Sequence, residues 1–259
     1  MAQLHCNFFS YSVGYPIDLQ IILPSMTAPD MDHPETRTHK IPAKYPLLYL
    51  LHGHGNDYQG WLRYTSMERY AEERKIAVVT MSVGNKGYMN AAYGEEYYKL
   101  IEEELPEFLQ ANFPVSERQE DTYIAGLSMG GYGALAHGLG HPQSYRAMGA
   151  FSPGVYMGMN DQIVLGHSMP EMMDLKKLAK KCKAEGNKIP ELFMCVGQDD
   201  FLYRDITDFH QFLVGEGIAH RYDDLPGYRH EWALWDRELE QFLDWIPRTD
   251  AWKDVRAQV

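Results

Sequence analysis

The chain is poor in cysteine and in positive charge, and it has no long apolar run. Its 259 residues include three cysteines, at Cys6, Cys182 and Cys195, an odd and sparse set that predicts no disulfide framework. Lys and Arg number 24 against 36 Asp and Glu, a formal net charge of −12. This charge argues against a nucleic-acid partner, because phosphate binding needs a basic face. The longest aliphatic and aromatic run covers residues 47–51, far short of a membrane span.

The amino-terminal residues also lack the marks of a targeting segment. Residues 1–6 contain no basic stretch followed by an apolar one, so no signal peptide is predicted. Hydrophobic residues make up 45% and charged residues 23%, which is an ordinary globular mixture. Because no repeat, low-complexity tract or linker divides the chain, we expect one cytoplasmic domain over residues 1–259, without a membrane partner. Self-association to a homo-oligomer stays open.

Predicted strands and helices alternate along most of the chain. The expected strands cover residues 5–10, 17–23, 46–52, 76–82, 122–127, 145–151, 191–196 and 219–225. The expected helices cover residues 61–75, 95–113, 129–138, 170–184, 203–214 and 231–246. Pro106 predicts a kink or break in the second of these helices, and the proline-bearing residues 25–45 predict a surface loop.

The order of these elements predicts the fold class. Repeated β-α-β units are typical of an α/β fold with a mostly parallel central sheet and helices on both faces. Ligands bind such sheets in the loops that follow the carboxyl ends of the strands. The chemistry of this chain is therefore expected in loops that directly follow strands.

Residues 126–130 read Gly-Leu-Ser-Met-Gly and match the G-x-S-x-G pattern of a nucleophile elbow. The pattern follows a predicted strand and opens a predicted helix, as the elbow requires. Such a sharp turn would hold Ser128 in a strained backbone conformation, while the two glycines let neighbouring backbone come close. Ser128 is therefore the candidate nucleophile. The alternative is a glycine-rich turn with a serine that caps the helix.

A serine nucleophile needs a histidine as base and a carboxylate that orients the histidine. In α/β-hydrolases the acid and then the histidine follow the serine along the chain. His230 lies in a loop after the last predicted strand and is the candidate base, whereas His210 and His220 are expected to be structural or surface residues. Asp199 and Asp200 both follow the preceding strand, and Asp200 is preferred as the acid.

Two backbone amides are expected to form an oxyanion hole. One belongs to Met129, the residue after the candidate nucleophile. The other is assigned to His54, whose neighbour Gly53 lets the backbone approach a ligand. His52 and His54 could instead bind a metal with acidic residues from positions 30–33. No HExxH or cysteine cluster accompanies them, so neither a metal nor another cofactor is predicted.

Four segments together resemble the esterase D family of α/β-hydrolases. They are Tyr-Leu-Leu-His-Gly at 49–53, Ala-Gly-Leu-Ser-Met-Gly-Gly-Tyr-Gly-Ala at 125–134, Asp-Phe-Leu-Tyr at 200–203 and Pro-Gly…His-Glu-Trp at 226–232. The likeness runs from about residue 45 to 246 and is strongest to the tributyrin-esterase branch. The same family contains acetylxylan and feruloyl esterases of carbohydrate esterase family 1, S-formylglutathione hydrolases and acyltransferases.

This resemblance implies an α/β-hydrolase fold and a serine carboxylesterase that works through an acyl-enzyme. It also implies Ser128, Asp200 and His230 as the catalytic triad, and the amides of His54 and Met129 as the oxyanion hole. The expected substrates are small-molecule or oligosaccharide esters with short-chain acyl, acetyl or feruloyl groups.

The substrate-binding residues are less closely specified by the sequence. Gly53, Tyr88, Tyr93 and Trp232 are expected at the site, where the aromatic rings either stack on a sugar or aromatic acid or pack in the core. A thioesterase for S-formylglutathione, an acyltransferase and a non-catalytic carbohydrate-binding relative are the alternatives. The segment that follows residues 151–153 lacks the Cys-Pro-Trp-Gly pattern of S-formylglutathione hydrolases. This absence favours a carboxylesterase over a thioesterase for S-formylglutathione.

Overall fold

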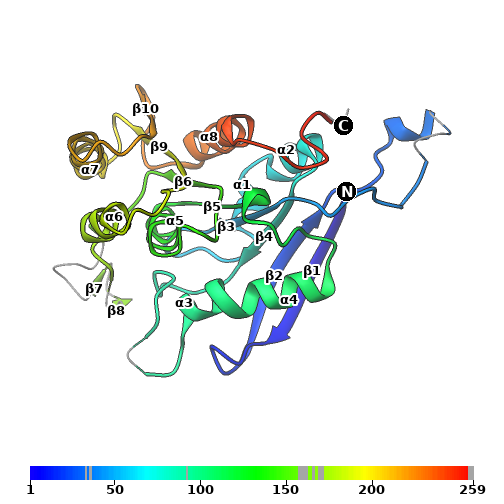
Figure 1. Cartoon of the computed structure of the whole chain (residues 1–259), viewed down its shortest axis with the longest axis horizontal. Coiled ribbons are helices and arrows are strands. Elements are labelled where there is room, and N and C mark those ends of the chain that lie inside the picture. Colours follow the sequence, from blue (N-terminus) through cyan, green and yellow to red (C-terminus); the bar gives the residue numbers. More distant parts are fainter. Residues whose placement is uncertain are drawn as a thin grey trace.

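The computed structural model describes residues 1–32, 34, 37–91, 93–156, 163–164, 167–168 and 172–255. An eight-stranded sheet in the strand order β1-β2-β4-β3-β5-β6-β9-β10 forms the centre of the molecule (Figure 1). β2 pairs antiparallel with β1 and with β4, and all other neighbouring strands are parallel. The predicted mostly parallel sheet is therefore confirmed.

All eight strands of this sheet fall where the sequence places strands. They are β1 Ala2–Phe9, β2 Pro16–Leu23, β3 Leu47–Leu51, β4 Ala77–Met81, β5 Thr122–Leu127, β6 Ala147–Phe151, β9 Glu191–Gly197 and β10 Arg221–Leu225. Every residue of β3, β4 and β6 is buried, because helices cover both faces of a parallel sheet. The short strands β7 Ile163–Val164 and β8 His167–Ser168 pair only with each other and are not predicted from the sequence.

Helices pack on the two faces of the sheet (Figure 1). They are α1 Gly60–Tyr64, α2 Met67–Arg74, α3 Tyr97–Lys99, α4 Leu105–Asn112, α5 Met129–Gly140, α6 Leu175–Ala184, α7 Tyr203–Gly215 and α8 Trp232–Trp245. Buried side chains of α1, α2 and α8 form one hydrophobic cluster with the sheet. Those of α3 to α7 form the other. Within the described ranges no helix is long and apolar enough to cross a membrane.

Two predicted helices differ in detail from the structure. The helix expected over 61–75 is divided into α1 and α2, because Thr65 is extended and the Ser66 amide donates to Asp236 Oδ1 of α8 at 2.8 Å. The helix expected over 95–113 is not broken at Pro106. A π-helical turn, Leu100–Glu104, joins α3 to α4, with the Leu105 amide bonded to the Leu100 carbonyl, and Pro106, which has no backbone N–H, directly follows this turn.

The loop over residues 25–45 is irregular except for a 3₁₀ turn, Pro29–Asp32, within its described residues. It borders a cavity that is also lined by Tyr45, Lys75 and Trp252. Tyr45 and Lys75 lie two residues before β3 and β4, so the loop lies at the amino ends of the parallel strands. It therefore lies at the edge of the sheet opposite to the carboxyl ends.

Candidate active site

Ser128 lies at the tight turn between β5 and α5. Its backbone has φ 52° and ψ −113°, which is a strained conformation for a residue other than glycine. The Ser128 amide donates to the Phe151 carbonyl at 2.9 Å, and the Ser128 carbonyl accepts from Tyr132 and Gly154. These three hydrogen bonds hold the turn in place. The strained conformation expected for Ser128 is confirmed.

Gly126 and Gly130 bring the turn against the neighbouring backbone. A Cβ atom on Gly126 would lie 2.5 Å from the Gly130 carbonyl, and one on Gly130 would lie 2.4 Å from the Leu51 carbonyl. Real side chains do not tolerate such contacts, so only glycine fits at both positions. The start of α5 is thereby pressed against the ends of β3 and β5.

His230 and Asp200 are joined by a hydrogen bond. His230 lies in the loop between β10 and α8, and its Nδ1 is 2.8 Å from Asp200 Oδ2. Burial by itself raises the pKa of Asp200, but hydrogen bonds from His230 and from the Leu202 amide outweigh it and hold this pKa below its ordinary value. Asp200 is therefore an ionised acceptor of the Nδ1 proton. A neutral His230 then presents an unprotonated Nε2, which can act as a base.

The other residues considered for these roles are used differently. Asp199 is exposed, and it is Asp200 that bonds to His230. His210 Nδ1 and His220 Nε2 lie 2.8 Å apart and pair with each other. Both histidines are thus engaged in the packing of α7 against the segment before β10.

The loop after β3 lies directly against the candidate nucleophile. A Cβ atom on Gly53 would lie 3.4 Å from Ser128 Cβ, so this loop adjoins the serine side chain. The Gly55 amide donates to Asn85 Oδ1 at 2.8 Å, which ties the loop to the segment after β4. Met129 is the first residue of α5, and an amide at that position has no partner within its own helix.

His52 is a structural residue of this loop. Its Nε2 accepts from the Val83 amide at 3.3 Å, and its Nδ1 is 2.7 Å from the Gly53 carbonyl. Burial lowers the pKa of His52 to about 4, so the ring is neutral. Both ring nitrogens serve backbone groups, which leaves none for a metal. No cluster of metal-ligating side chains occurs among the described residues.

The aromatic residues expected to bind substrate have three different surroundings. Tyr88 is fully buried and donates its hydroxyl to the His52 carbonyl at 2.8 Å, so it supports the loop and does not line a substrate site. This expectation is corrected. Tyr93 is 95% exposed. Trp232 is half-buried and stacks on Tyr64 with 4.9 Å between ring centroids, at the start of α8.

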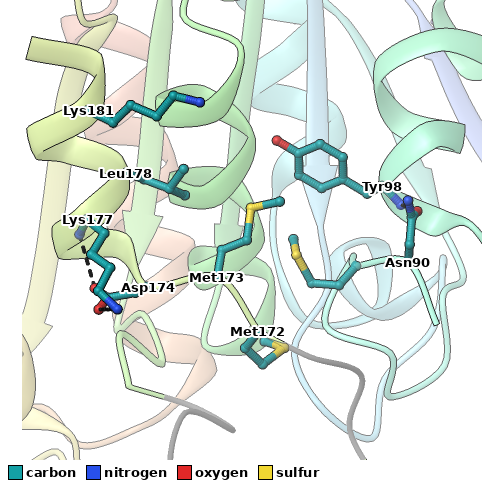
Figure 2. A pocket seen from close by; sticks show the side chains of 9 residues that line it. Asn90, Tyr98, Met172, Met173, Asp174, Lys177, Leu178 and Lys181 are labelled. Atoms are coloured by element: carbon teal, nitrogen blue, oxygen red, sulfur yellow. Dashed lines mark hydrogen bonds and ion pairs between the residues drawn. The ribbon is translucent and has the colours of Figure 1, made fainter. Parts of the chain in front are cut away.

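A cavity of about 700 Å³ lies beside α5, between α3 and α6 (Figure 2). Methionine side chains face Tyr98 across it, and polar groups stand at its rim (Figure 2). Tyr132, one turn after Ser128, both donates to and accepts from the Met173 backbone, so the cavity wall at Met173 is joined to the helix that begins at Ser128.

The residues that line the cavity are Met89, Asn90, Tyr98, Met172, Met173, Asp174, Lys177, Leu178 and Lys181. Sequence reasoning missed this cavity, because these residues come from three separate segments. Residues 157–160, in the segment that follows residues 151–153, lie outside the described residues.

The sheet order and the elbow are those of an α/β-hydrolase, and comparisons with known proteins agree. Residues 15–246 match the family model described as "Putative esterase", and the chain belongs to this esterase family. It is 29% identical over 270 residues to an acetyl esterase of Caldicellulosiruptor saccharolyticus, covering 96% of this chain and 99% of the relative. The predicted esterase D-like membership is thus confirmed.

Solved structures give the same result. The fluorophosphonate-binding serine hydrolase FphF of Staphylococcus aureus is 31% identical, with a TM-score of 0.82, covering 95% of this chain and 98% of that one. The S-formylglutathione hydrolase FrmB of the same organism is 30% identical, with a TM-score of 0.80 and the same coverage. A ferulic acid esterase, 21% identical with a TM-score of 0.73, covering 95% of this chain and 97% of that one, shares the fold. The chain is a carboxylic ester hydrolase with the α/β-hydrolase fold.

Proposed function

We propose that Ser128, His230 and Asp200 form the catalytic triad of a serine esterase. The observation that carries this proposal is the hydrogen bond of 2.8 Å between His230 Nδ1 and Asp200 Oδ2, on loops that end at the same edge of the sheet as the strained Ser128. This edge is where parallel sheets bind ligands. The serine hydrolase FphF, which is 31% identical, supports the same chemistry.

In the proposed reaction Ser128 Oγ attacks the ester carbonyl while His230 Nε2 takes the hydroxyl proton. The amides of His54 and Met129 hold the negative charge that develops on the carbonyl oxygen. The alcohol then leaves with the proton from His230, and the acyl group stays on Ser128. Water attacks this acyl-enzyme with His230 again as base and releases the acid. Asp200 keeps the ring oriented throughout.

Replacing the nucleophile tests the proposal. We expect Ser128→Ala to lower kcat for p-nitrophenyl acetate by about 10⁴-fold or more and to abolish labelling by a fluorophosphonate probe. The melting temperature should not fall, since the change removes one hydroxyl from a strained turn. Ser144→Ala, a serine outside the site, serves as the control and should retain both activities. Full turnover by the Ser128 variant would contradict the assignment.

We further propose that the preferred substrates are short-chain acyl esters, acetyl esters foremost. The acetyl esterase relative supports this choice. A panel of acetylated xylo-oligosaccharides, methyl ferulate and p-nitrophenyl esters of increasing chain length would rank the substrates by kcat/KM. A higher kcat/KM for ferulate or long-chain esters would overturn the preference for acetyl.

The similarity to FrmB favours a second candidate function, hydrolysis of S-formylglutathione. The same triad would attack the thioester carbonyl and release the thiolate. Including S-formylglutathione in the panel separates the two functions, because a thioesterase should turn it over far faster than any oxygen ester. Competing alcohols in the same assay would detect an acyltransferase through the new ester formed.

A further inference from the structure

Ser152 lies between the candidate nucleophile and the candidate acid. It directly follows β6, the strand between β5 and β9. Its amide donates to the Cys195 carbonyl of β9 at 2.9 Å, and the carbonyl of the preceding residue, Phe151, accepts from the Ser128 amide. The backbone of Ser152 is thereby joined to the strand that leads to Asp200 and to the turn that carries Ser128.

Two features of Ser152 are unfavourable for stability. Its φ is 45°, a left-handed conformation that side chains other than glycine's rarely adopt. Its side chain is also fully buried. Among the described residues, its hydroxyl has no partner that meets both the distance and the angles of a hydrogen bond. Glycine would avoid both costs, whereas alanine would avoid only the buried hydroxyl. Strained, buried polar residues of this kind collect at functional sites.

The Asp200 carboxylate follows β9, the strand whose Cys195 carbonyl accepts from the Ser152 amide. Asp200 Oδ2 accepts from His230 and Oδ1 from the Leu202 amide, and a carboxylate has capacity for further donors. Burial raises the pKa of Asp200, while hydrogen bonding by His230, by Leu202 and, to a smaller extent, by Ser152 lowers it. The Cys195 thiol is also titratable, and burial first, then the charge of Glu238 and less strongly that of Asp200, raise its pKa, so it is neutral.

We propose that Ser152 is a positioning residue of the reaction, whose hydroxyl donates to the Asp200 carboxylate and keeps Oδ2 aimed at His230. This inference rests on the proposed triad. The third donor spreads the negative charge of Asp200, so that the carboxylate orients the imidazole without binding its protonated form too tightly.

The experiment compares Ser152→Ala with Ser152→Gly. Both variants lose the hydroxyl, but only glycine relieves the left-handed backbone, so Ser152→Gly should have the higher melting temperature. We expect both to lower kcat for p-nitrophenyl acetate about tenfold. Without this donor Asp200 stabilises protonated His230 more strongly. The acidic limb of the kcat/KM profile should therefore move to higher pH by about half a unit.

Ser116→Ala is the matched control. Ser116 is also buried and donates to a buried carboxylate, Asp121 Oδ2, at 2.6 Å, but it lies at the amino end of β5. Its loss should lower stability without moving the pH profile. Wild-type kcat and an unshifted acidic limb in both Ser152 variants would overturn the inference. If the wild-type enzyme were not labelled by a fluorophosphonate at Ser128, the triad itself would fail, so the two failures are distinguishable.

Discussion

At the scale of single residues, His52 shows how a polar group is used inside the loop after β3. The Val83 amide donates to its Nε2, so in the neutral ring the proton is on Nδ1, which faces the Gly53 carbonyl. Tyr88 donates to the carbonyl of His52 itself. A buried network of neutral groups therefore sets the position of the loop proposed to hold the oxyanion.

The pKa of His52 leads to a prediction for stability. This pKa is lowered to about 4 in the folded state, against an ordinary value near 6.5. The contribution of the neutral ring is complete above about pH 6.5 and is lost as the pH falls toward 4, because the unfolded chain then binds the proton. For His52→Gln we expect this part of the pH dependence, about 3 kcal/mol of unfolding free energy, to disappear.

Urea unfolding between pH 4 and 7.5 checks this expectation. His39→Gln, in the exposed loop far from the site, provides the comparison and should follow the wild-type curve. The His52 variant should be less stable at pH 7.5, since it loses hydrogen bonds, but flatter with pH. A slope equal to that of the wild type would show that His52 does not carry the effect.

At the scale of elements, the parallel strands could be predicted because each is a short, continuous apolar run. The π-helical turn before α4 could not. There the Glu104 carboxylate accepts from the Ser10 hydroxyl and from the amides of Tyr11 and Ser12 at 2.8 to 2.9 Å. These partners lie more than ninety residues away in the sequence. Local sequence patterns cannot predict a contact between residues so far apart in the chain. They indicate only that Pro106 could kink or break the helix.

The contact between α5 and the ends of the strands gives a prediction for this element. Gly130→Ala would place a methyl group 2.4 Å from the Leu51 carbonyl, and backbone on both sides must move. We expect a loss of about 3 kcal/mol or more in unfolding free energy, together with lower activity. Gly215→Ala at the end of α7 meets nothing within 4 Å. It should be neutral or raise stability by about 0.5 to 1 kcal/mol, and equal effects at both sites would refute the argument.

At the scale of the whole molecule, the sequence specifies the proposed catalytic residues better than their surroundings. Ser128, Asp200 and His230 stand in short patterns directly after strands, and parallel strands bring such loops together. The sequence leaves open whether Tyr88 binds substrate or packs in the core, because an aromatic residue in a loop carries no local sign of burial. The cavity beside α5 depends on how α3 and α6 approach each other, which no single segment encodes.

The loop over residues 25–45 lies at the amino ends of β3 and β4. Ser128 lies at the opposite edge of the sheet, where the parallel strands end. The loop is therefore a suitable point for attaching the enzyme to a support. Fastened to a solid support through this loop, each molecule would turn its reactive edge toward the solution, where esters arrive and products leave without passing the point of attachment.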